Sequence, residues 1–469
     1  MKRRPLPPFF AAALIALWPA PLWAHASEQG FVLLLPTGAY TVAGTLAVVF
    51  SLVLVTVLSP RVLAVLFRAR RLSFSLNWPA GQMAISILGT VVFLALVYIG
   101  LQGPTDPQNN LLPLTLWTVW WVGLFVVQGL VADVWRWINP WTGVHQLLAG
   151  GSAPLLRLPE RWGAWPAVAV FLMFQGFILA DVAPNDPDRL ALFALGYWVF
   201  TLAGMILCGS ERWLAQVECF TVLFALIGRL RPVQAGGQGR YGFAGWRAVV
   251  EAPLHPSHAV FCLVILASGS FDGLHETFWW LAQIGINPLA FPGRSAVVMP
   301  TLVGLYAANA ALITVFALAV WVGLVAVRRW GGGQAPGFGV AFNSFAIAIL
   351  PIALGYHFAH YFVTFLVQIQ YVAATLADPL ARGWNLFGLG AVRVTTGFLN
   401  TQDTVRVIWI TQAAAVVASH ILSVLMTHHL AAGFVQKNRD LIALQIGLSL
   451  LMIAYTIFGL WLLASPRGV

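Results

Sequence analysis

Two histidines lie close together inside one apolar stretch of the sequence. Phe345–Gln370 reads FAIAILPIALGYHFAHYFVTFLVQIQ, is long enough to span a bilayer, and contains His357 and His360. Because these residues are three positions apart, one helix would present both imidazoles on the same face. Metal-capable side chains inside a membrane segment are costly and by default mark function. The spacing therefore indicates a polar, metal-capable site, in a helix that Pro351 is expected to kink.

A second apolar segment, 405–427, can face these histidines. It contains Gln412 and His420, which are eight residues apart and therefore share a helix face about 12 Å apart along the axis. If the two helices are antiparallel, His357 and His360 lie nearest the depth of Gln412. A metal centre of His357, His360 and His420 therefore requires the helix boundaries to shift by about one turn. The alternatives are hydrogen bonds between the imidazoles or to backbone carbonyls, and haem ligation.

A third group of chemistry-capable residues is expected in a loop after the span 256–270. The sequence FDGLHETFWW places Asp272, His275 and Glu276 within five positions. Carboxylates beside an imidazole can bind a metal ion or transfer a proton, so Asp272 and His275 are candidate catalytic residues. The two tryptophans that follow can anchor the segment at the membrane surface or stack against an aromatic substrate. The structural alternative is an amphipathic segment that lies on the membrane surface.

Two further polar groups are expected to be structural. His255 and His258 have a spacing that can bind metal, but Pro256 between them favours a helix start that Ser257 can cap. Asp133 and Arg136 are three positions apart at the end of an expected helix and can form an ion pair.

The composition is that of a membrane protein. Of 469 residues, 60% are hydrophobic and 9% are charged, and the mean hydropathy is +0.84. Repeated apolar runs of about 20 residues predict an all-α polytopic membrane protein that contacts the lipid bilayer. The formal charge of +10 comes from residues in loops between apolar runs, without a basic stripe interleaved with aromatics. We therefore expect no nucleic-acid partner.

About ten transmembrane helices are expected. Their ranges are 33–58, 82–101, 112–132, 165–182, 190–208, 256–270, 301–327, 339–372, 405–427 and 441–464. Basic residues cluster in every second loop, whereas the opposite loops 104–110 and 181–188 are acidic or neutral. By the positive-inside rule, this alternation places the mature N- and C-termini outside.

The first 26 residues read MKRRPLPPFFAAALIALWPAPLWAHA, which is typical of a secretory signal peptide. Cleavage after Ala26 leaves residues 27–469 as a single helical membrane domain, and an uncleaved first helix is the alternative. Cleavage after Ala24 would instead expose His25, whose amine and imidazole can together hold copper.

Several other segments are expected not to span the membrane. Residues 214–228 are too short to span comfortably and are expected to form an interfacial or re-entrant helix. Residues 271–300 and 373–404 are expected to be outer loops, and Gly331–Gly339 an inner linker. The three cysteines lie in or beside apolar segments without a CxxC pair, so no disulfide or thiolate metal site is expected. Nucleotide-binding and soluble-hydrolase motifs are also absent from the sequence.

Several motifs together resemble a family of bacterial integral membrane proteins labelled fenitrothion hydrolase. They are GLVADVWRWINPW, ECFTVLFALIGRLRP, ASGSFDGLHETFWW, LPIALGYHFAHYF, RGWNLFG and QAAAVVASHILSVLMTHH. The resemblance implies a subunit of an organophosphate hydrolase in the bacterial inner (cytoplasmic) membrane. Such an enzyme would cleave an aryl phosphate ester such as fenitrothion to a nitrophenol, and would form a complex with a second, homologous membrane subunit. The family supplies no catalytic residues that can be carried over.

The residues are compatible with this chemistry. Hydrolysis of a small hydrophobic phosphotriester needs an activated water and stabilisation of charge at the phosphoryl oxygen, and a histidine-bound, zinc-like divalent metal supplies both. The same intramembrane histidines are also compatible with a metal or ion transporter, or with a haem-bearing redox subunit. A transporter would be expected to show paired broken helices in two halves, and Pro351 gives one such break.

Overall fold

The computed structural model describes residues 32, 34–58, 60–73, 78–235, 238–331, 333–388 and 392–467. The expected signal peptide, residues 1–26, lies outside these described residues.

The chain is an all-α polytopic membrane protein, as the sequence predicts. Within the described residues, nine helical segments are long and apolar enough to cross a membrane, and a tenth, α10 (Trp165–Ala180), is shorter. The ten segments lie on the ten ranges expected from the sequence. The nine are α3 (Thr37–Val57), α5 (Pro79–Gln102), α6 to α7 (Leu111–Leu130), α11 (Pro187–Cys208), α15 (Pro256–His275), α17 (Val298–Trp330), α18 to α19 (Phe338–Ala377), α20 (Gln402–Ala432) and α21 (Asn438–Ala464).

Short elements connect these helices. The helical ones are α4 (Pro60–Leu66), α8 (Trp135–Ile138), α9 (Thr142–Ala149), η2 (Glu160–Trp162), α12 (Ser210–Gln216), α13 (Cys219–Ile227), α14 (Trp246–Val250), α16 (Phe278–Gln283), η3 (Pro288–Ala290), η4 (Arg294–Ala296) and η6 (Gly397–Leu399). Three two-residue strands, β1 (Arg70–Arg71), β2 (Val233–Gln234) and β3 (Arg240–Tyr241), form an antiparallel sheet in the order β1-β3-β2. In its register Tyr241 lies opposite both Arg70 and Val233, so the sheet joins two expected basic loops.

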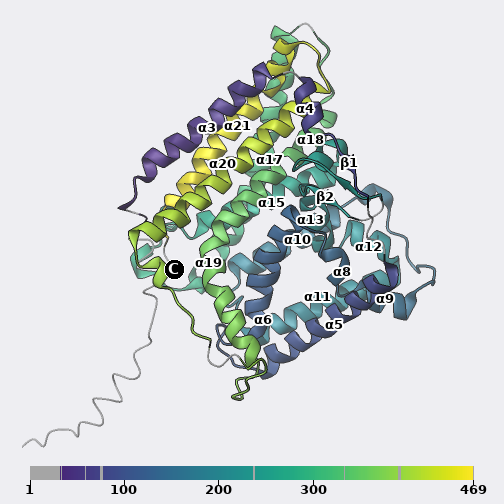
Figure 1. Cartoon of the computed structure of the whole chain (residues 1–469), viewed down its shortest axis with the longest axis vertical. Coiled ribbons are helices and arrows are strands. Elements are labelled where there is room, and N and C mark those ends of the chain that lie inside the picture. The colour runs from purple at the N-terminus through teal and green to yellow at the C-terminus, as the bar shows by residue number, and fades with distance from the viewer. Residues whose placement is uncertain are drawn as a thin grey trace, which may run out of the picture.

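The helices form two groups that share two central helices (Figure 1). α3, α17, α20 and α21 pack side by side in one group, and α5, α6, α10 and α11 belong to the other. α15 contacts α17 in the first group and α10 in the second, while α19 contacts α20 and α6. α15 and α19 therefore each pack against both groups.

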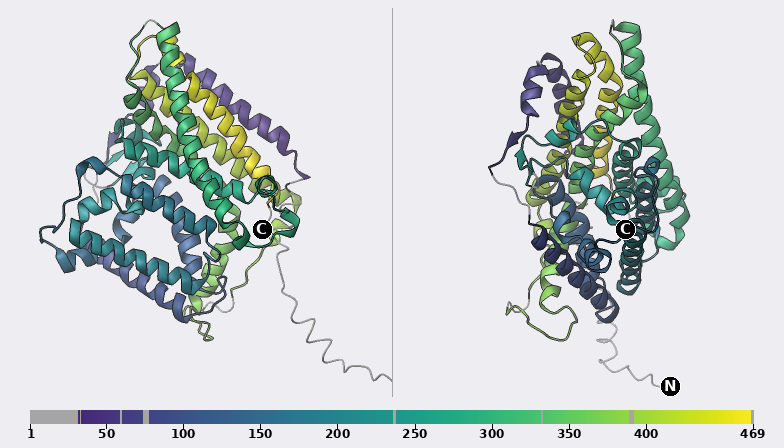
Figure 2. Two further views of the ribbon diagram at one scale, coloured as in Figure 1. Left: turned by 180° about the vertical axis from the view of Figure 1, so that it is seen from behind. Right: turned by 90° about the vertical axis from the view of Figure 1, so that its right-hand side faces the viewer.

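α17 and α21 lie side by side (Figure 2), and glycines face backbone at their contact. A Cβ on Gly323 would collide with the carbonyl oxygen of Leu444, and one on Gly447 would collide with that of Ala319. Small residues allow helix backbones to approach in this way in membranes. This contact fixes where α21 ends relative to α15.

The expected irregularity at Pro351 is present, as a break in the helix. α18 (Phe338–Phe345) is followed by a 3₁₀ turn, η5 (Ala346–Ile349), and α19 (Leu350–Ala377) then begins with Pro351 in its first turn. Proline has no N–H to donate, so it fits the first turn of a helix, and Leu350 before it keeps α conformation.

Residues 214–228 form parts of two short helices, α12 and α13. Glu218 separates them and caps α13, since its carboxylate accepts hydrogen bonds from the backbone N–H groups of Phe220 (2.9 Å) and Thr221 (2.6 Å). All of α13 except Thr221 and Ala225 is buried. A helix on the membrane surface would leave one face exposed, so this burial favours the re-entrant alternative.

The α17–α21 contact gives a testable prediction. Gly323→Ala should lower the free energy of unfolding by about 1–3 kcal/mol, because the added methyl group meets a backbone carbonyl that cannot rotate away. The measurement is thermal or denaturant unfolding of the purified protein in detergent. Gly196→Ala in α11 is the matched control, because its Cβ would meet nothing within 4 Å. Equal stability of the two variants would contradict the close backbone contact.

Candidate functional site

The last turn of α15 carries two of the residues that the sequence assigns to a loop. α15 continues through His275, so the expected helix end at residue 270 is wrong by more than a turn. Asp272 and His275 therefore lie on a rigid element, and Glu276 is the residue at the C-terminal cap. Gly269 and Gly273 suggest a helix end in the sequence, but Gly273 is needed for packing, because a Cβ there would collide with the hydroxyl of Tyr356.

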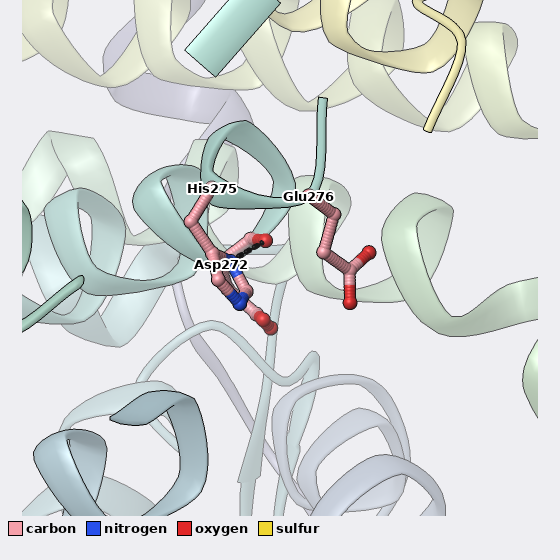
Figure 3. Close-up of side chains that lie close together, drawn as sticks. All are labelled: Asp272, His275 and Glu276. Carbon is pink, nitrogen blue, oxygen red and sulfur yellow. Dashed lines mark hydrogen bonds between the residues drawn. The ribbon is translucent and has the colours of Figure 1, made fainter. Parts of the chain in front are cut away.

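Asp272, His275 and Glu276 form the metal-capable group of this site (Figure 3). One ligand atom from each, a carboxylate oxygen or an imidazole nitrogen, lies within 4.8 Å of the other two. Nδ1 of His275 lies 2.6 Å from the carbonyl oxygen of Asp272 and must donate to it, which leaves the Nε2 lone pair available. A hydrogen bond of this kind is the usual device that orients an imidazole toward a metal ion. Asp272 is buried, whereas His275 and Glu276 are partly exposed.

The carboxylate of Asp272 is held by two residues of α19. The Tyr361 hydroxyl donates a short hydrogen bond to Oδ2 of Asp272, and Nε2 of His360 lies 3.3 Å from the same oxygen. Trp121, in the π-helical turn η1 (Thr115–Leu124), donates from Nε1 to the Tyr361 hydroxyl at 3.3 Å. Three elements that are far apart in the sequence therefore meet at one carboxylate.

Both ring nitrogens of His360 have partners. Nη2 of Arg467 lies 3.4 Å from Nδ1, and Nε2 faces Asp272. Tyr356 stacks almost parallel to the ring, with centroids 5.8 Å apart and an interplanar angle of 9°. His360 is therefore a hydrogen-bonding partner of Asp272, and no lone pair remains for a metal ion in this arrangement.

His357 and His420 lie in separate surroundings. Nε2 of His357 donates to the carbonyl oxygen of Trp121 at 3.0 Å, and the ring packs on Phe125 with centroids 4.2 Å apart. His420 donates from Nδ1 to the carbonyl oxygen of Val416 at 2.8 Å, and its Nε2 has no hydrogen-bond partner among the described residues.

The expected metal centre of His357, His360 and His420 is therefore not assembled. Across the described residues, the group of three metal-capable side chains with ligand atoms within 4.8 Å of one another is Asp272, His275 and Glu276. The physical reason is helix depth, because Gln412 donates to the carbonyl oxygen of Ala359 at 2.7 Å and Ser419 lies against Gly355, which leaves His420 deeper than His360. His357 and His420 instead donate to backbone carbonyls, the structural alternative for these imidazoles.

The two groups expected to be structural have different partners from those predicted. His255, not Ser257, caps α15, because its Nδ1 accepts from the Ser257 backbone N–H at 3.3 Å. Asp133 pairs with Arg231 at 2.8 Å rather than with Arg136. The His255 cap is a local contact, whereas Asp133 and Arg231 are 98 positions apart, a pairing that local spacing does not encode.

A small cavity lies beside the buried carboxylate. Counted as space open to the centre of a water-sized sphere, its volume is about 20 Å³, and Asp272, Tyr361, Trp121 and Gln175 contribute to its lining. About 10–15 Å³ on that measure is enough for one water molecule. Small-molecule pockets are commonly about 300–1,000 Å³, so in this conformation the cavity accommodates a water or a bare ion but not a phosphotriester.

Two arginines offset the negative charge of the group. Nη1 of Arg467 lies 3.7 Å from Oε2 of Glu276. Arg294 donates to the carbonyl oxygens at the end of α10 and is close enough to Glu276 and Asp272 to be attracted by both. Burial lowers the pKa of Arg294, and these carboxylates oppose that effect. Two carboxylates and two guanidinium groups therefore give this end of α15 a balanced charge.

Three residues of the site are not found by reasoning from sequence. Tyr361 follows directly after His360, and that position is the signal that could have suggested it. Trp121 carries no signal, because tryptophans in apolar segments are numerous. Arg467 is a basic residue directly after the last apolar run, and its charge was the only clue.

The fold and the site define the class of this protein as a polytopic helical membrane protein with a buried carboxylate–imidazole group at one end of α15. Comparison with protein-family models, curated proteins and solved structures found no match. The resemblance to the fenitrothion hydrolase family therefore rests on the quoted sequence motifs.

The hydrogen bonds around Asp272 give a prediction about stability. Tyr361→Phe should reduce the free energy of unfolding by about 1–3 kcal/mol, because it leaves the buried carboxylate and the Trp121 indole N–H each short of one partner. Tyr98→Phe is the control, since Tyr98 is 54% exposed on α5. Unfolding in detergent should separate the two variants. A Tyr361→Phe protein as stable as the control would show that the hydroxyl does not hold Asp272.

Proposed function

We propose that this chain is a subunit of a membrane-bound, metal-dependent organophosphate hydrolase whose ion is held by Asp272, His275 and Glu276. The observation that carries the proposal is the convergence of their three ligand atoms within 4.8 Å at the end of one helix. The proposal keeps Asp272 and His275 as site residues and replaces the three-histidine metal centre. The quoted motifs supply the substrate class, a small hydrophobic aryl phosphotriester such as fenitrothion.

The donor set fits a zinc-like divalent cation. Carboxylate oxygens and a neutral imidazole are ligands that zinc accepts, and His275 already has Nδ1 engaged by a carbonyl so that Nε2 is free. Such an ion would lower the pKa of a bound water and polarise the phosphoryl oxygen. Three protein ligands would leave a coordination position for that water, as in catalytic rather than structural zinc sites.

The other residues of the site have supporting roles in this proposal. Tyr361 and His360 hold the carboxylate of Asp272 in place, so that it can present an oxygen to the ion without reorganising. Arg467 and Arg294 lie where they can attract the negative charge that develops on the phosphoryl group. The aromatic walls and the buried position of Asp272 exclude bulk water from one side of the site.

The substrate would approach from the side of Glu276. The cavity beside Asp272 is too small for a triester, whereas Glu276 and His275 are partly exposed at the end of α15. Trp279 in α16 is 51% exposed next to this end and can contact an aromatic leaving group. A second, homologous membrane subunit can complete the wall of the binding site.

We also propose that this end of α15 faces the outside of the bacterial inner membrane. The expected cytoplasmic basic loops meet at the sheet of β1 and β3, near the start of α15. Because α15 spans the membrane, its other end, with Asp272 and Glu276, would face the opposite side. This orientation gives an extracellular hydrophobic substrate direct access to the site.

Activity measurements test the proposed ion ligands. The protein purified with its partner subunit should release nitrophenol from fenitrothion, and chelation should abolish the release until zinc is restored. His275→Gln and Glu276→Gln should each lower kcat/KM by more than about 100-fold, since removing a ligand should exceed the 10- to 100-fold cost typical of its outer-shell partners. His420→Gln is the matched control and should retain activity. Loss in His420→Gln with full activity in the other two variants would favour the three-histidine centre.

The orientation has its own test. A reporter that is active only outside the inner membrane, fused after Arg467, should be active, because an even number of spans after a cleaved leader places both ends outside. A reporter inserted between β2 and β3 should be inactive. The reverse pattern would contradict the orientation and the proposed route of the substrate.

A second candidate function is transport of a metal or other small ion. The observation that favours it is the cavity of about 20 Å³ against a buried carboxylate, which suits a water or an ion better than an ester. Proteoliposomes should then take up zinc or manganese without hydrolysing fenitrothion, and Asp272→Asn should block the uptake. Absence of uptake in active hydrolase preparations would remove this alternative.

A further inference from the structure

The described segment that follows α21 lies beside the candidate site. α21 ends at Ala464, and the following residues 465–467, here called the C-terminal strap, run antiparallel to the start of α16. The Phe278 backbone N–H donates to the carbonyl oxygen of Pro466 at 3.0 Å, and Thr277 and Arg467 form an isolated β-bridge. Trp279 and Trp461 pack edge to face nearby, with centroids 6.1 Å apart. The strap therefore has a defined position over the end of α15.

The strap directs one charged side chain into the site. Nη2 of Arg467 lies 3.4 Å from Nδ1 of His360, and Nη1 lies 3.7 Å from Oε2 of Glu276. The Arg467 side chain is 23% exposed, so water screens this charge less than it would screen a surface arginine. Arg467 thus contacts both the proposed ion ligand Glu276 and His360, the residue that faces Asp272.

The contacts of His360 with Arg467 and Asp272 are satisfied by one proton position. A guanidinium group has only donors, so Nδ1 of His360 must accept, and the ring proton of the neutral imidazole must be on Nε2. This tautomer directs an N–H at Oδ2 of Asp272, 3.3 Å away. The carboxylate of Asp272 only accepts, so it requires the same tautomer, and Arg467 occupies the lone pair that this tautomer leaves on Nδ1.

We propose that Arg467 is a positioning residue of the candidate site and its built-in cation. It donates to Nδ1 of His360, holds the strap against α16, and opposes binding of a divalent cation by Asp272, His275 and Glu276. The last part rests on the proposed metal site, whereas the first two do not. A cation entering the group would meet the positive charge of Arg467 and compete with it for Glu276.

Zinc affinity tests the opposing charge. Titration of metal-free protein with Zn²⁺ should show about tenfold tighter binding for Arg467→Gln than for wild type, because one nearby positive charge is removed. Arg467→Lys should bind like wild type. Arg406→Gln is the matched control, since it removes the same charge from an exposed position on α20. Equal or weaker binding by Arg467→Gln would overturn the proposal, because a purely structural role would weaken the site.

A measurement without metal tests the positioning role. Hydrogen exchange of the Phe278 amide, which donates to Pro466, should speed up at least about tenfold in Arg467→Gln and stay unchanged in Arg406→Gln. Unchanged protection in Arg467→Gln would show that Arg467 does not hold the strap. If neither the wild type nor any variant binds Zn²⁺, the proposed metal site is refuted, and so is the proposal that Arg467 opposes cation binding. The exchange experiment still decides whether Arg467 positions the strap.

Discussion

The candidate site is built around one buried carboxylate, that of Asp272, which needs hydrogen-bond donors and nearby positive charge. An isolated ionised carboxylate costs on the order of tens of kcal/mol to transfer into an apolar medium, so it must be given donors or compensating charge. Asp272 receives a hydrogen bond from Tyr361, faces Nε2 of His360, and is attracted by Arg294. These partners come from α19 and from the loop before α17. The middle of α19 and the segment before α17 are therefore constrained to meet the end of α15.

Helix packing supplies the rest of this constraint. The glycines between α17 and α21 let the two helices lie in close contact, which brings the end of α21 to the end of α15. Arg467 can then reach His360 although the two residues are 107 positions apart in the sequence. On the other side, the π-helical turn η1 places Trp121 so that its indole donates to Tyr361 and its carbonyl accepts from His357. The candidate site is thus where the two helical groups meet.

The sequence predicts the architecture of this chain well because length and apolarity decide it. Each expected span lies on a helix, and the expected irregularity at Pro351 is present, because both depend on local properties of the chain. The spatial arrangement of the site residues is harder to predict from the sequence. Asp272 and His275 were identified from their types, but the helix that carries them continues through two glycines that in isolation suggest its end.

The predicted metal centre of His357, His360 and His420 depends on the relative depth of two helices, and these three side chains do not converge in this structure. Periodicity shows which residues share a face, but it does not fix how two helices slide along one another, and one turn separates a shared site from separate ones. His420 accordingly donates to Val416 within its own helix, and His357 donates to Trp121. The contributions of Tyr361 and Arg467 depend on long-range packing, which no local spacing records. Glu276, and not a histidine from another helix, completes the group, from the cap of the same helix as Asp272 and His275.

The central claim is that a mixed oxygen and nitrogen group at the end of α15 holds the ion. The most direct measurement is the X-ray absorption spectrum of the zinc-loaded, purified protein. The account predicts a first shell of oxygen and nitrogen ligands at about 2.0–2.2 Å, with the multiple scattering of a single imidazole. A shell with three imidazoles would contradict the account and return the metal to His357, His360 and His420.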